Sequence, residues 1–438
     1  MSADKKSIVI IGGGIIGSTT AYFLTRHPKY DPSRHSIHLL EATAIASGAS
    51  GKAGGLLALW AYPQSLVPLS FRLHRELAAE HGGAARWGYR GVGCGQVELR
   101  ARKLEAAEAE AIADSTKTGD AAAHVKTGDA AAHVKTGHAA AHVSLQKRAG
   151  ESDTRPSRKK NRTGLPTGLD WLADECVESY DSMGGPSDTA QVHPYQFTTA
   201  MASLAAERGA NIILGKVSRI EDEDSAIKRV HYQLSSSLSS PSSQVIEATD
   251  IIITAGPWSK HIWPSAPISN TRAHSVTIRP SHPTSAHCLF TSLLLPKGFK
   301  SNKSAQVVTP ELYSRPNNEV YACGEGDHLA PLPASTADVV VDPDRCQDLV
   351  DYCSSISDEL RDGQVLVRQA CYLPLVAGGG GPMVGRTESP GVWIATGHTC
   401  WGIQNGPATG KLMSEFIFDG AAGSANIRDL DPKRWLSR

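Results

Sequence analysis

The chain has 438 residues, more than one hydrophobic core usually supports, so we expect two domains. Lys plus Arg and Asp plus Glu both number 44, and this balance argues against a polyanionic partner such as nucleic acid. The N-terminus leads into an apolar strand without a signal-peptide pattern, and no apolar run approaches the roughly 18 residues of a membrane span. These features predict a cytoplasmic protein without a membrane span.

A glycine-rich turn follows the first predicted strand. The strand covers residues 7–11, and apolar residues at helical spacing over 18–25 predict a helix after it. Gly12, Gly14 and Gly17 lie between the two, with the GxGxxG spacing of a dinucleotide-binding turn. In such a turn the first glycine permits the bend, the second leaves room for the pyrophosphate, and the third lets helix and strand pack closely. Glycine spacing alone does not separate NAD from FAD, and a glycine turn that binds nothing is the alternative.

An acidic residue ends the second predicted strand. The sequence HSIHLLE covers 35–41 and places Glu41 24 residues after Gly17, the last glycine of the turn. Its carboxylate can accept hydrogen bonds from the hydroxyls of an adenosine ribose. Strand, glycine turn, helix and acid together predict a bound dinucleotide.

The middle of the chain contains an internal repeat of nine residues. KTGDAAAHV occurs at 117–125 and 126–134, and KTGHAAAHV occurs at 135–143. A period of nine is too short for the usual helical solenoids, so we predict a surface insertion over 110–165. The alternatives are a nucleic-acid contact by the basic run 158–162 and a metal site at His124, His133, His138 and His142.

The eight cysteines are widely scattered and include no CxxC pair. This pattern is typical of buried thiols and predicts neither a redox disulfide nor a zinc knuckle. We therefore expect no bound metal.

Later elements return to the opening domain. Residues 193–223 predict a helix, a strand and a turn. The serine-rich stretch 235–243 predicts a flexible connection between two hairpin strands, 228–234 and 244–253. The C-terminal residues predict strand, strand and helix, so the nucleotide-binding domain is expected to consist of three separated pieces.

Four stretches resemble the D-amino-acid oxidase superfamily of FAD-dependent oxidoreductases, which includes glycine oxidase and monomeric sarcosine oxidase. They are GGGIIG with Glu41, ASGASGKAGGLLA at 46–58, LGKVSRI with ITAGPW, and ATGHTCWGIQNGPATGK at 395–411. TAQVHPYQFT and LYSRPNNEVYACGEGDHLAPLP are similar to fungal members. A plain NAD domain has no use for the second small-residue loop at 46–58, so the resemblance favours FAD.

The resemblance implies an α/β fold, with a Rossmann-like FAD-binding domain of the glutathione-reductase type beside a mostly antiparallel β-sheet substrate domain. The FAD-binding domain would take residues 1–66, 186–265 and 365–438. The substrate domain would take 67–185, which contains the insertion, and 266–364.

The resemblance also implies which residues contact FAD. Val217 would present its backbone to the adenine, and the loop that begins at Gly397 would face the flavin pyrimidine and stabilise negative charge there. The chain has no second GxGxxG turn after a strand, so an NAD(P)H-reducing domain is not expected. The full predicted set is Gly12, Gly14, Ile15, Ile16, Gly17, Glu41, Ala42, Ser47, Ser50, Gly51, Gly54, Gly55, Leu56, Val217, Ala255, Gly256, Trp258, Cys371, Gly397, His398, Trp401, Gly402 and Ile403.

The substrate strand departs from the superfamily pattern. Members oxidise an amine or amino acid by hydride transfer to flavin N5, and the amino-acid oxidases bind the substrate carboxylate with an arginine just before a strand proline. Here Leu373 precedes Pro374, and glycines at 378–381 replace the usual acidic residue. We therefore expect a secondary amine or a modified amino acid as substrate, with O2 as acceptor. An amine dehydrogenase with another acceptor, and a flavin-binding protein with a structural or trafficking role, are the alternatives.

Three residues are candidates for catalysis. Arg368 is a substitute anchor for a carboxylate, with Arg315 as its alternative. His274 is a candidate base or oxygen-activating group, and Tyr372 offers a hydroxyl to a ligand. Cys371 has the spacing of the cysteine that carries covalent flavin in sarcosine-oxidase relatives, and a buried thiol is its alternative.

Overall fold

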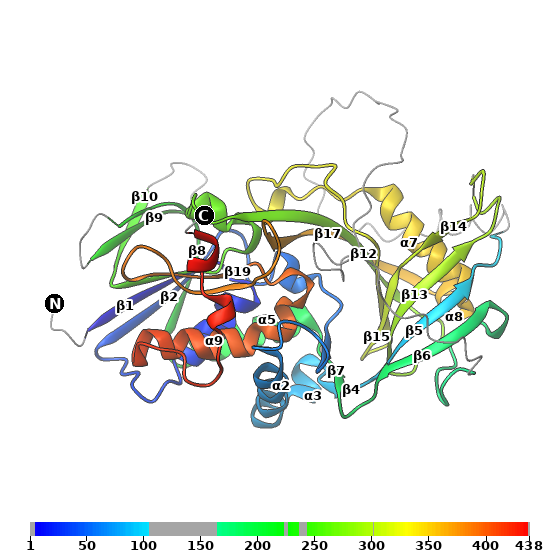
Figure 1. The fold of residues 1–438 in the computed structure, drawn as a ribbon, viewed down its shortest axis with the longest axis horizontal. Helices are drawn as coiled ribbons and strands as arrows, with labels where there is room; N and C mark the ends of the chain where they lie inside the picture. The colour runs from blue at the N-terminus through cyan, green and yellow to red at the C-terminus, as the bar shows by residue number, and fades with distance from the viewer. Residues whose placement is uncertain (1–4, 105–163, 223–226, 236–242, 301, 437–438) are drawn as a thin grey trace.

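The structure is a computed structural model that describes residues 5–104, 164–222, 227–235, 243–300 and 302–436. Two bodies lie side by side in Figure 1, one around a mainly parallel sheet and the other around a mainly antiparallel sheet. The nine-residue repeat, its four histidines and the basic run that follows it lie outside the described residues.

The first sheet combines strands that are far apart in the sequence. Their order is β10-β9-β8-β2-β1-β11-β19-β18. The five strands from β8 to β19 in this order run parallel, and the remaining three are antiparallel to their neighbours. The strands are β1 (Lys6–Ile11), β2 (His35–Glu41), β8 (Ala210–Glu221), β9 (Lys228–Leu234), β10 (Ser243–Ala248), β11 (Asp250–Ile253), β18 (Met383–Arg386) and β19 (Val392–Thr396).

Both faces of the parallel strands are buried, as parallel sheets require. Ile8 and Ile10 of β1 share a core with the helices on one face, whereas Val9 and Ile11 share a core with β9, β10 and the segment after β11. The helical face carries α1 (Ile15–Leu24), α2 (Val67–His81), α3 (Gly83–Trp87), α5 (Pro194–Ala206) and α9 (Gly402–Asp419), and α6 (Ser259–Ile262) lies on the opposite side. The helix expected over 18–25 begins earlier, at Ile15. The turn between β1 and α1 takes only residues 12–14, so the helix starts before the third glycine, Gly17.

The second sheet is mostly antiparallel, as expected. Its order is β17-β12-β16-β15-β13-β5-β6, with β14 paired to β13, and only β13 and β5 run parallel among its described strands. Helices α7 (Pro343–Ile356) and α8 (Asp358–Arg361) bury one face, and the other face is turned to the first body. The strands are β5 (Gly93–Arg100), β6 (Val177–Gly184), β12 (Ile268–Arg279), β13 (His287–Leu295), β14 (Gln306–Val308), β15 (Glu311–Arg315), β16 (Glu319–Cys323) and β17 (Gln364–Val376).

Smaller elements complete the fold. A short sheet of β3 (Leu56–Ala58), β7 (Thr189–Gln191) and β4 (Arg90–Gly91) lies between the bodies, and α10 (Lys433–Leu436) is near the C-terminus. The predicted hairpin forms between β9 and β10, but the expectation that its second strand runs on to residue 253 is wrong. Asp250–Ile253 forms a separate strand, β11, paired with β1.

The cysteines and the apolar helices of the structure bear on two predictions made from the sequence. All eight cysteines are free thiols, and all except Cys400 are buried, which confirms the expectation of unpaired cysteines. Among the described residues, no helix has the length and apolar character needed to span a membrane.

Candidate active site

A large cavity opens at the carboxyl ends of the parallel strands, where this class of sheet binds nucleotides. It has about 1270 Å³ of empty space, including the part open to solvent. Most of the residues predicted to contact FAD lie around it. They are Gly12, Gly14, Ile15, Ile16, Glu41, Ala42, Ser47, Ser50, Val217, Ala255, Gly256, Trp258, His398, Gly402 and Ile403.

The glycine turn brings backbone close to backbone. Gly12 has a φ of +115°, and a Cβ on it would lie 2.6 Å from the Thr254 carbonyl oxygen. A Cβ on Gly17 would lie 1.9 Å from the Gly12 carbonyl oxygen, so this glycine supports the contact between α1 and the turn. Gly17 does not line the cavity. It acts through packing, which is the role that the turn requires of its third glycine.

Polar groups meet at the N-terminus of α1. The backbone N–H of Ile15 donates to Ser50 Oγ at 2.9 Å, and that of Gly13 donates to Glu41 Oε2 at 2.8 Å. The other oxygen of Glu41 accepts from the backbone of Thr43 at 3.0 Å. A carboxylate thus lies at the edge of the glycine turn, while the first turn of the helix faces a cavity that can take a pyrophosphate.

The C-terminal loop closes another side of the cavity. Gly397 and Thr399 both have positive φ, +83° and +53°, and α9 starts at Gly402 with its N-terminus toward the cavity. His398 is 3 % exposed and its Nε2 contacts Thr409 Oγ1 at 3.0 Å. Burial lowers the pKa of His398 to about 3, so this imidazole is neutral. The positive end of the α9 dipole is therefore the local electrostatic feature that favours negative charge on a bound group.

The small-residue loop lies between the cavity and the second sheet. A Cβ on Gly54 would meet the Tyr313 ring at 2.8 Å, and Gly55 has a φ of +97°. Arg315 of β15 donates to the carbonyls of Ala53 and Gly54. Gly51, Gly54, Gly55 and Leu56, which were predicted to contact FAD, are not among the lining residues, and neither are Cys371, Gly397 and Trp401.

The three catalytic candidates lie on the far face of the second sheet. In the register of β12 and β17, Ala273 is opposite Cys371, and these two pack toward Ala49 and Cys400 beside the cavity. Because side chains alternate along a strand, the neighbouring positions of both strands point away. His274, Arg368 and Tyr372 occupy those positions, and none of them lines the cavity.

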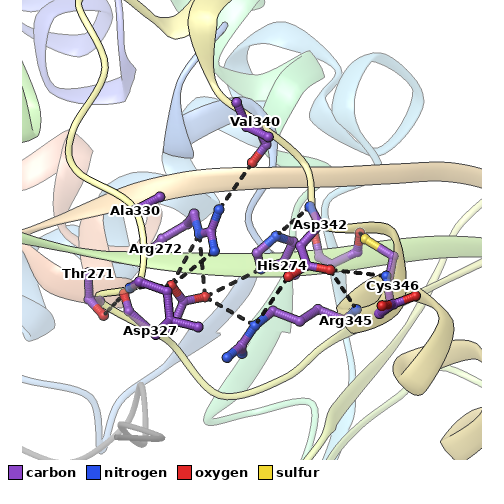
Figure 2. Close-up of polar contacts among 12 residues, drawn as sticks. Thr271, Arg272, His274, Asp327, Ala330, Val340, Asp342, Arg345 and Cys346 are labelled. Carbon is purple, nitrogen blue, oxygen red and sulfur yellow. Dashed lines mark hydrogen bonds and ion pairs between the residues drawn. The ribbon is translucent and has the colours of Figure 1, made fainter. Parts of the chain in front are cut away.

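On that far face, each of the three candidates makes a hydrogen bond to another part of the protein. His274 Nε2 accepts from the backbone of Asp342 at 3.0 Å, Arg368 donates to Gln347 at 2.7 Å, and the Tyr372 hydroxyl donates to the carbonyl of Pro331 at 2.9 Å. Figure 2 shows His274 beside Arg272, Asp327 and Arg345. Burial and then the Arg272 charge lower the pKa of His274 to about 4. This arrangement does not favour His274, Arg368 or Tyr372 as groups that touch a substrate.

Cys371 faces the cavity side of the sheet but is fully packed. It is 7 % exposed, and burial raises its pKa to about 11, so it is a thiol at neutral pH. Lys52 lies nearby, and its Nζ donates to the Ala370 carbonyl at 2.9 Å. The residues that reach the cavity from this strand are Leu373 and Pro374.

Several residues that line the cavity were not among the FAD contacts predicted from the sequence. Ala334, Ser335 and Thr336 come from the connection between β16 and α7, and Thr336 Oγ1 contacts Ser47 Oγ at 2.8 Å. Thr254 donates from Oγ1 to the Gly12 carbonyl at 3.0 Å. Thr254 could have been predicted from the sequence, because it directly precedes Ala255 and Gly256. The stretch that contains Thr336 has no local motif that would have identified it.

These residues fit FAD. The glycine turn leaves no room for a side chain, an acidic residue stands at the turn, and two helix N-termini face the cavity. A large cavity lined in part by glycine, alanine and serine suits a dinucleotide that lies against backbone.

Comparison with known proteins agrees with this geometry. The family model described as FAD dependent oxidoreductase matches residues 7–416. "Putative oxidoreductase TDA3" of Saccharomyces cerevisiae is 37% identical over 508 residues, covering 99% of this chain and 96% of its own. "Putative oxidoreductase C1F5.03c" of Schizosaccharomyces pombe is 32% identical over 443 residues, covering 98% and 99%.

Solved structures share the fold at low sequence identity. Glycine oxidase from Geobacillus kaustophilus matches with a TM-score of 0.63 and 18% identity, covering 98% of this chain and 99% of that one. Iminodiacetate oxidase from Chelativorans sp. BNC1 matches with a TM-score of 0.63 and 18% identity, covering 97% and 98%. The chain therefore belongs to the family of FAD-dependent oxidoreductases that the D-amino-acid oxidase type represents, and FAD is its cofactor.

Proposed function

We propose that the protein oxidises a C–N bond of a secondary amine or a modified amino acid, with O2 as electron acceptor. The observation that carries this proposal is the composition of the sheet face beside the cavity. The part of that face next to the cavity consists of the uncharged residues Ala273, Cys371 and Leu373, and Pro374 follows them at the cavity wall. FAD supplies the hydride acceptor, N5 of its flavin.

The chain's own groups would orient the substrate and exclude water. The N-terminus of α9 stabilises negative charge on the bound cofactor, and the neutral imidazole of His398 adds no competing charge to the loop before it. The second sheet covers the cavity with buried side chains, which desolvates a bound amine.

The predicted set of FAD contacts is part of this proposal. Four further residues are proposed to contact FAD because they also line the cavity: Thr254, Ala334, Ser335 and Thr336. The domain limits at 66, 185, 265 and 364 and the cytoplasmic location stay predictions, and so does the absence of a nucleic-acid partner.

The test is the visible absorbance of the yellow holoprotein, recorded without oxygen. Secondary amines, N-methyl and other N-substituted amino acids, glycated amino acids and D-amino acids are added one class at a time. We expect one class to bleach the flavin, and readmitted O2 to restore the colour with release of hydrogen peroxide. Bleaching followed by slow recovery in O2 would favour a dehydrogenase with another acceptor.

A flavin-binding protein without turnover is the second candidate, because the sequence-predicted catalytic residues lie away from the cavity. Its signature is thermal stabilisation by FAD without bleaching by any compound. FAD at 100 times its Kd would add about 2.7 kcal/mol to the stability of the protein by mass action alone. Measuring the melting temperature with and without FAD beside the absorbance assay separates the two candidates.

A further inference from the structure

A surface loop of the second body forms one wall of the cavity. Residues 328–341, here called the strap, lie in the connection between β16 and α7, and residues 334–336 of the strap line the cavity. Both ends of the strap meet at Arg272 of β12. Arg272 exchanges backbone hydrogen bonds with Asp327 at 2.7 and 2.9 Å, and its guanidinium donates to the Val340 carbonyl at 3.4 Å (Figure 2). A loop whose ends lie this close is a compact unit attached at one base.

Hydrogen bonds from side chains hold the strap in place. In the described part of the chain, residues 328–334 make no hydrogen bond between backbone groups. The Tyr372 hydroxyl donates to the Pro331 carbonyl at 2.9 Å, and Trp258 Nε1 donates to the Pro333 carbonyl at 2.7 Å. The strap can therefore detach from these side chains without breaking a sheet.

The strap is anchored on two opposite walls of the cavity. Trp258, which holds Pro333, follows β11, whereas Ser47 follows β2 and contacts Thr336 Oγ1 at 2.8 Å. The Thr43 hydroxyl, also after β2, contacts the same oxygen of Thr336. In the sheet, β2 and β11 are the two neighbours of β1, the strand that leads into the glycine turn. The strap therefore crosses the carboxyl end of β1, over the turn that fits the pyrophosphate of FAD.

The strap is thin and has little slack where it crosses. Ala334 lines the cavity and is also exposed to solvent, so a single layer of chain separates the two. Strands on either side of a third strand are about 10 Å apart, and three extended residues reach about 10 Å. Ser335 has an extended backbone, with φ −154° and ψ 172°. The segment from Pro333 to Thr336 is thus just long enough to join the two anchors.

We propose that the strap is a clasp that retains FAD, and that it must detach from Trp258 and Ser47 before FAD enters or leaves the cavity. Trp258 and Thr336 act as positioning residues for the strap. Both anchors join groups of the protein itself, so they hold the strap closed with and without FAD. A weaker anchor raises the open population, and it therefore speeds the entry and the release of FAD alike. FAD exchange does not depend on the identity of the substrate, so a failure of the proposed oxidation leaves this mechanism untouched.

The first test measures FAD exchange on the holoprotein. The change of flavin fluorescence after dilution gives the release rate constant koff, a dilution series at equilibrium gives Kd, and the ratio koff/Kd gives the entry rate constant kon. Trp258→Phe removes the N–H that holds Pro333 and keeps an aromatic ring. We expect koff to rise at least about fivefold, the effect of about 1 kcal/mol from one hydrogen bond. Because kon rises as well, Kd should change less than koff.

Trp263→Phe is the matched control. Trp263 follows α6, and its Nε1 has no hydrogen-bond partner among the residues that the structure describes. This variant loses the same atoms as Trp258→Phe without releasing the strap, so koff and kon should stay as they are in the unmodified protein.

Thr336→Val tests the other anchor. It removes the hydroxyl that contacts Ser47 and Thr43 and keeps the size of the side chain. We expect koff and kon to rise together again. Since both anchors must open, the double variant with Trp258→Phe should show the product of the two single effects.

A cross-link tests the clasp in the opposite direction. Ser47 Oγ and Thr336 Oγ1 are 2.8 Å apart, so thiols at these positions can form a disulfide after a small adjustment. In the double variant Ser47→Cys with Thr336→Cys, oxidised glutathione accepts the two electrons of the thiols. We expect koff of the oxidised holoprotein to fall at least about tenfold. Reduction with tris(2-carboxyethyl)phosphine should restore it, and each single cysteine variant controls for oxidation elsewhere.

The outcomes decide between a clasp and an ordinary contact. Rate constants koff and kon that rise together in the anchor variants, or a koff that falls on cross-linking, support the clasp. A rise of koff with an unchanged kon would show a direct contact with FAD and refute the clasp. Rates equal to those of Trp263→Phe, or a cross-linked protein that releases FAD as fast as the reduced one, would also refute it.

FAD content and melting temperature report whether each variant folds. If an anchor variant does not fold, the cross-linked protein decides. If the disulfide does not form, the anchor variants decide.

Discussion

Asp327 is the centre of a buried ion cluster that we expect to be essential for stability. Its side chain is 1 % exposed, and it contacts Arg272 at 3.1 Å and Arg345 at 3.4 Å (Figure 2). The backbone N–H of Leu329 donates to Asp327 Oδ1 at 2.9 Å. Asp327→Asn keeps the size and this backbone contact but removes the negative charge, which leaves Arg272 buried without its counterion.

The expected loss follows from the burial of the two arginines. Removing one partner of a buried ion pair costs about 3–5 kcal/mol, because the remaining charge stays desolvated. Arg272, with a side chain 6 % exposed, keeps its hydrogen bonds to the retained Oδ1 and a long contact to the Val340 carbonyl at 3.4 Å, but it loses the negative charge. Arg345, at 19 % exposure, is partly solvated and still has Asp342 at 3.9 Å. We therefore expect the lower end of the range, a decrease of about 3 kcal/mol in the free energy of unfolding.

The loss should extend to cofactor binding. Asp327 begins the segment that brings Ala334, Ser335 and Thr336 to the cavity, and Arg272 exchanges backbone hydrogen bonds with it at 2.7 and 2.9 Å. Loosening this segment removes one wall of the cavity, so the Kd for FAD should rise in the same variant.

Urea unfolding followed by tryptophan fluorescence, with and without FAD, measures both effects. Asp348→Asn is the control, because Asp348 is 44 % exposed and its ion pair with Lys300 should contribute less than about 1 kcal/mol. A decrease below about 1 kcal/mol for Asp327→Asn, or one equal to that of the control, would refute the reasoning.

Three further predictions concern the cavity and its surroundings. Gly17→Ala puts a Cβ 1.9 Å from the Gly12 carbonyl oxygen, so α1 must shift; we expect about 1–3 kcal/mol of lost stability and little FAD in the purified protein, and full FAD content would argue against this packing. Burial lowers the pKa of His74 to about 4, below the 6.5 of an unfolded chain, so the unfolded state binds the proton first and stability declines as the pH falls from 6.5 to 4. This residue alone should cost about 2 kcal/mol at pH 5, and His74→Gln should flatten the dependence of the urea midpoint on pH between 7.5 and 5 if the sign is right. Cys371 is a buried thiol with a pKa raised to about 11, so acid denaturation should release all FAD from the unmodified protein and from Cys371→Ser alike, and flavin that stays with the precipitate would show a covalent bond.

The glycine turn was predictable because its requirements are local. Gly17 is constrained by the Gly12 carbonyl in the same turn, whereas Gly12 is constrained by the backbone that follows β11, the strand paired with β1. The end of β2, the other neighbour of β1, brings Glu41 to the turn. Such positions depend on few other parts of the chain. The family resemblance then supplied the more distant cavity residues, such as Val217 and Gly402.

The catalytic candidates could not be placed from the sequence. Alternation separates His274 from Ala273, but it does not tell which of the two faces the cofactor. That choice depends on α7, which covers one side of the sheet and takes His274 against its first residues.

The walls of the cavity come from residues between 11 and 403, and this has a consequence for how the protein is made. Lys6 and Asp250, which form an ion pair beside the junction of β1 and β11, are separated by 244 positions in the chain. While the chain grows from the ribosome, one edge of β1 has no partner strand until β11 emerges, and an open edge invites association with other chains. The dinucleotide cannot be enclosed until α9 has been synthesised, so it is captured by a nearly finished chain and does not serve as a template for the earlier steps of folding.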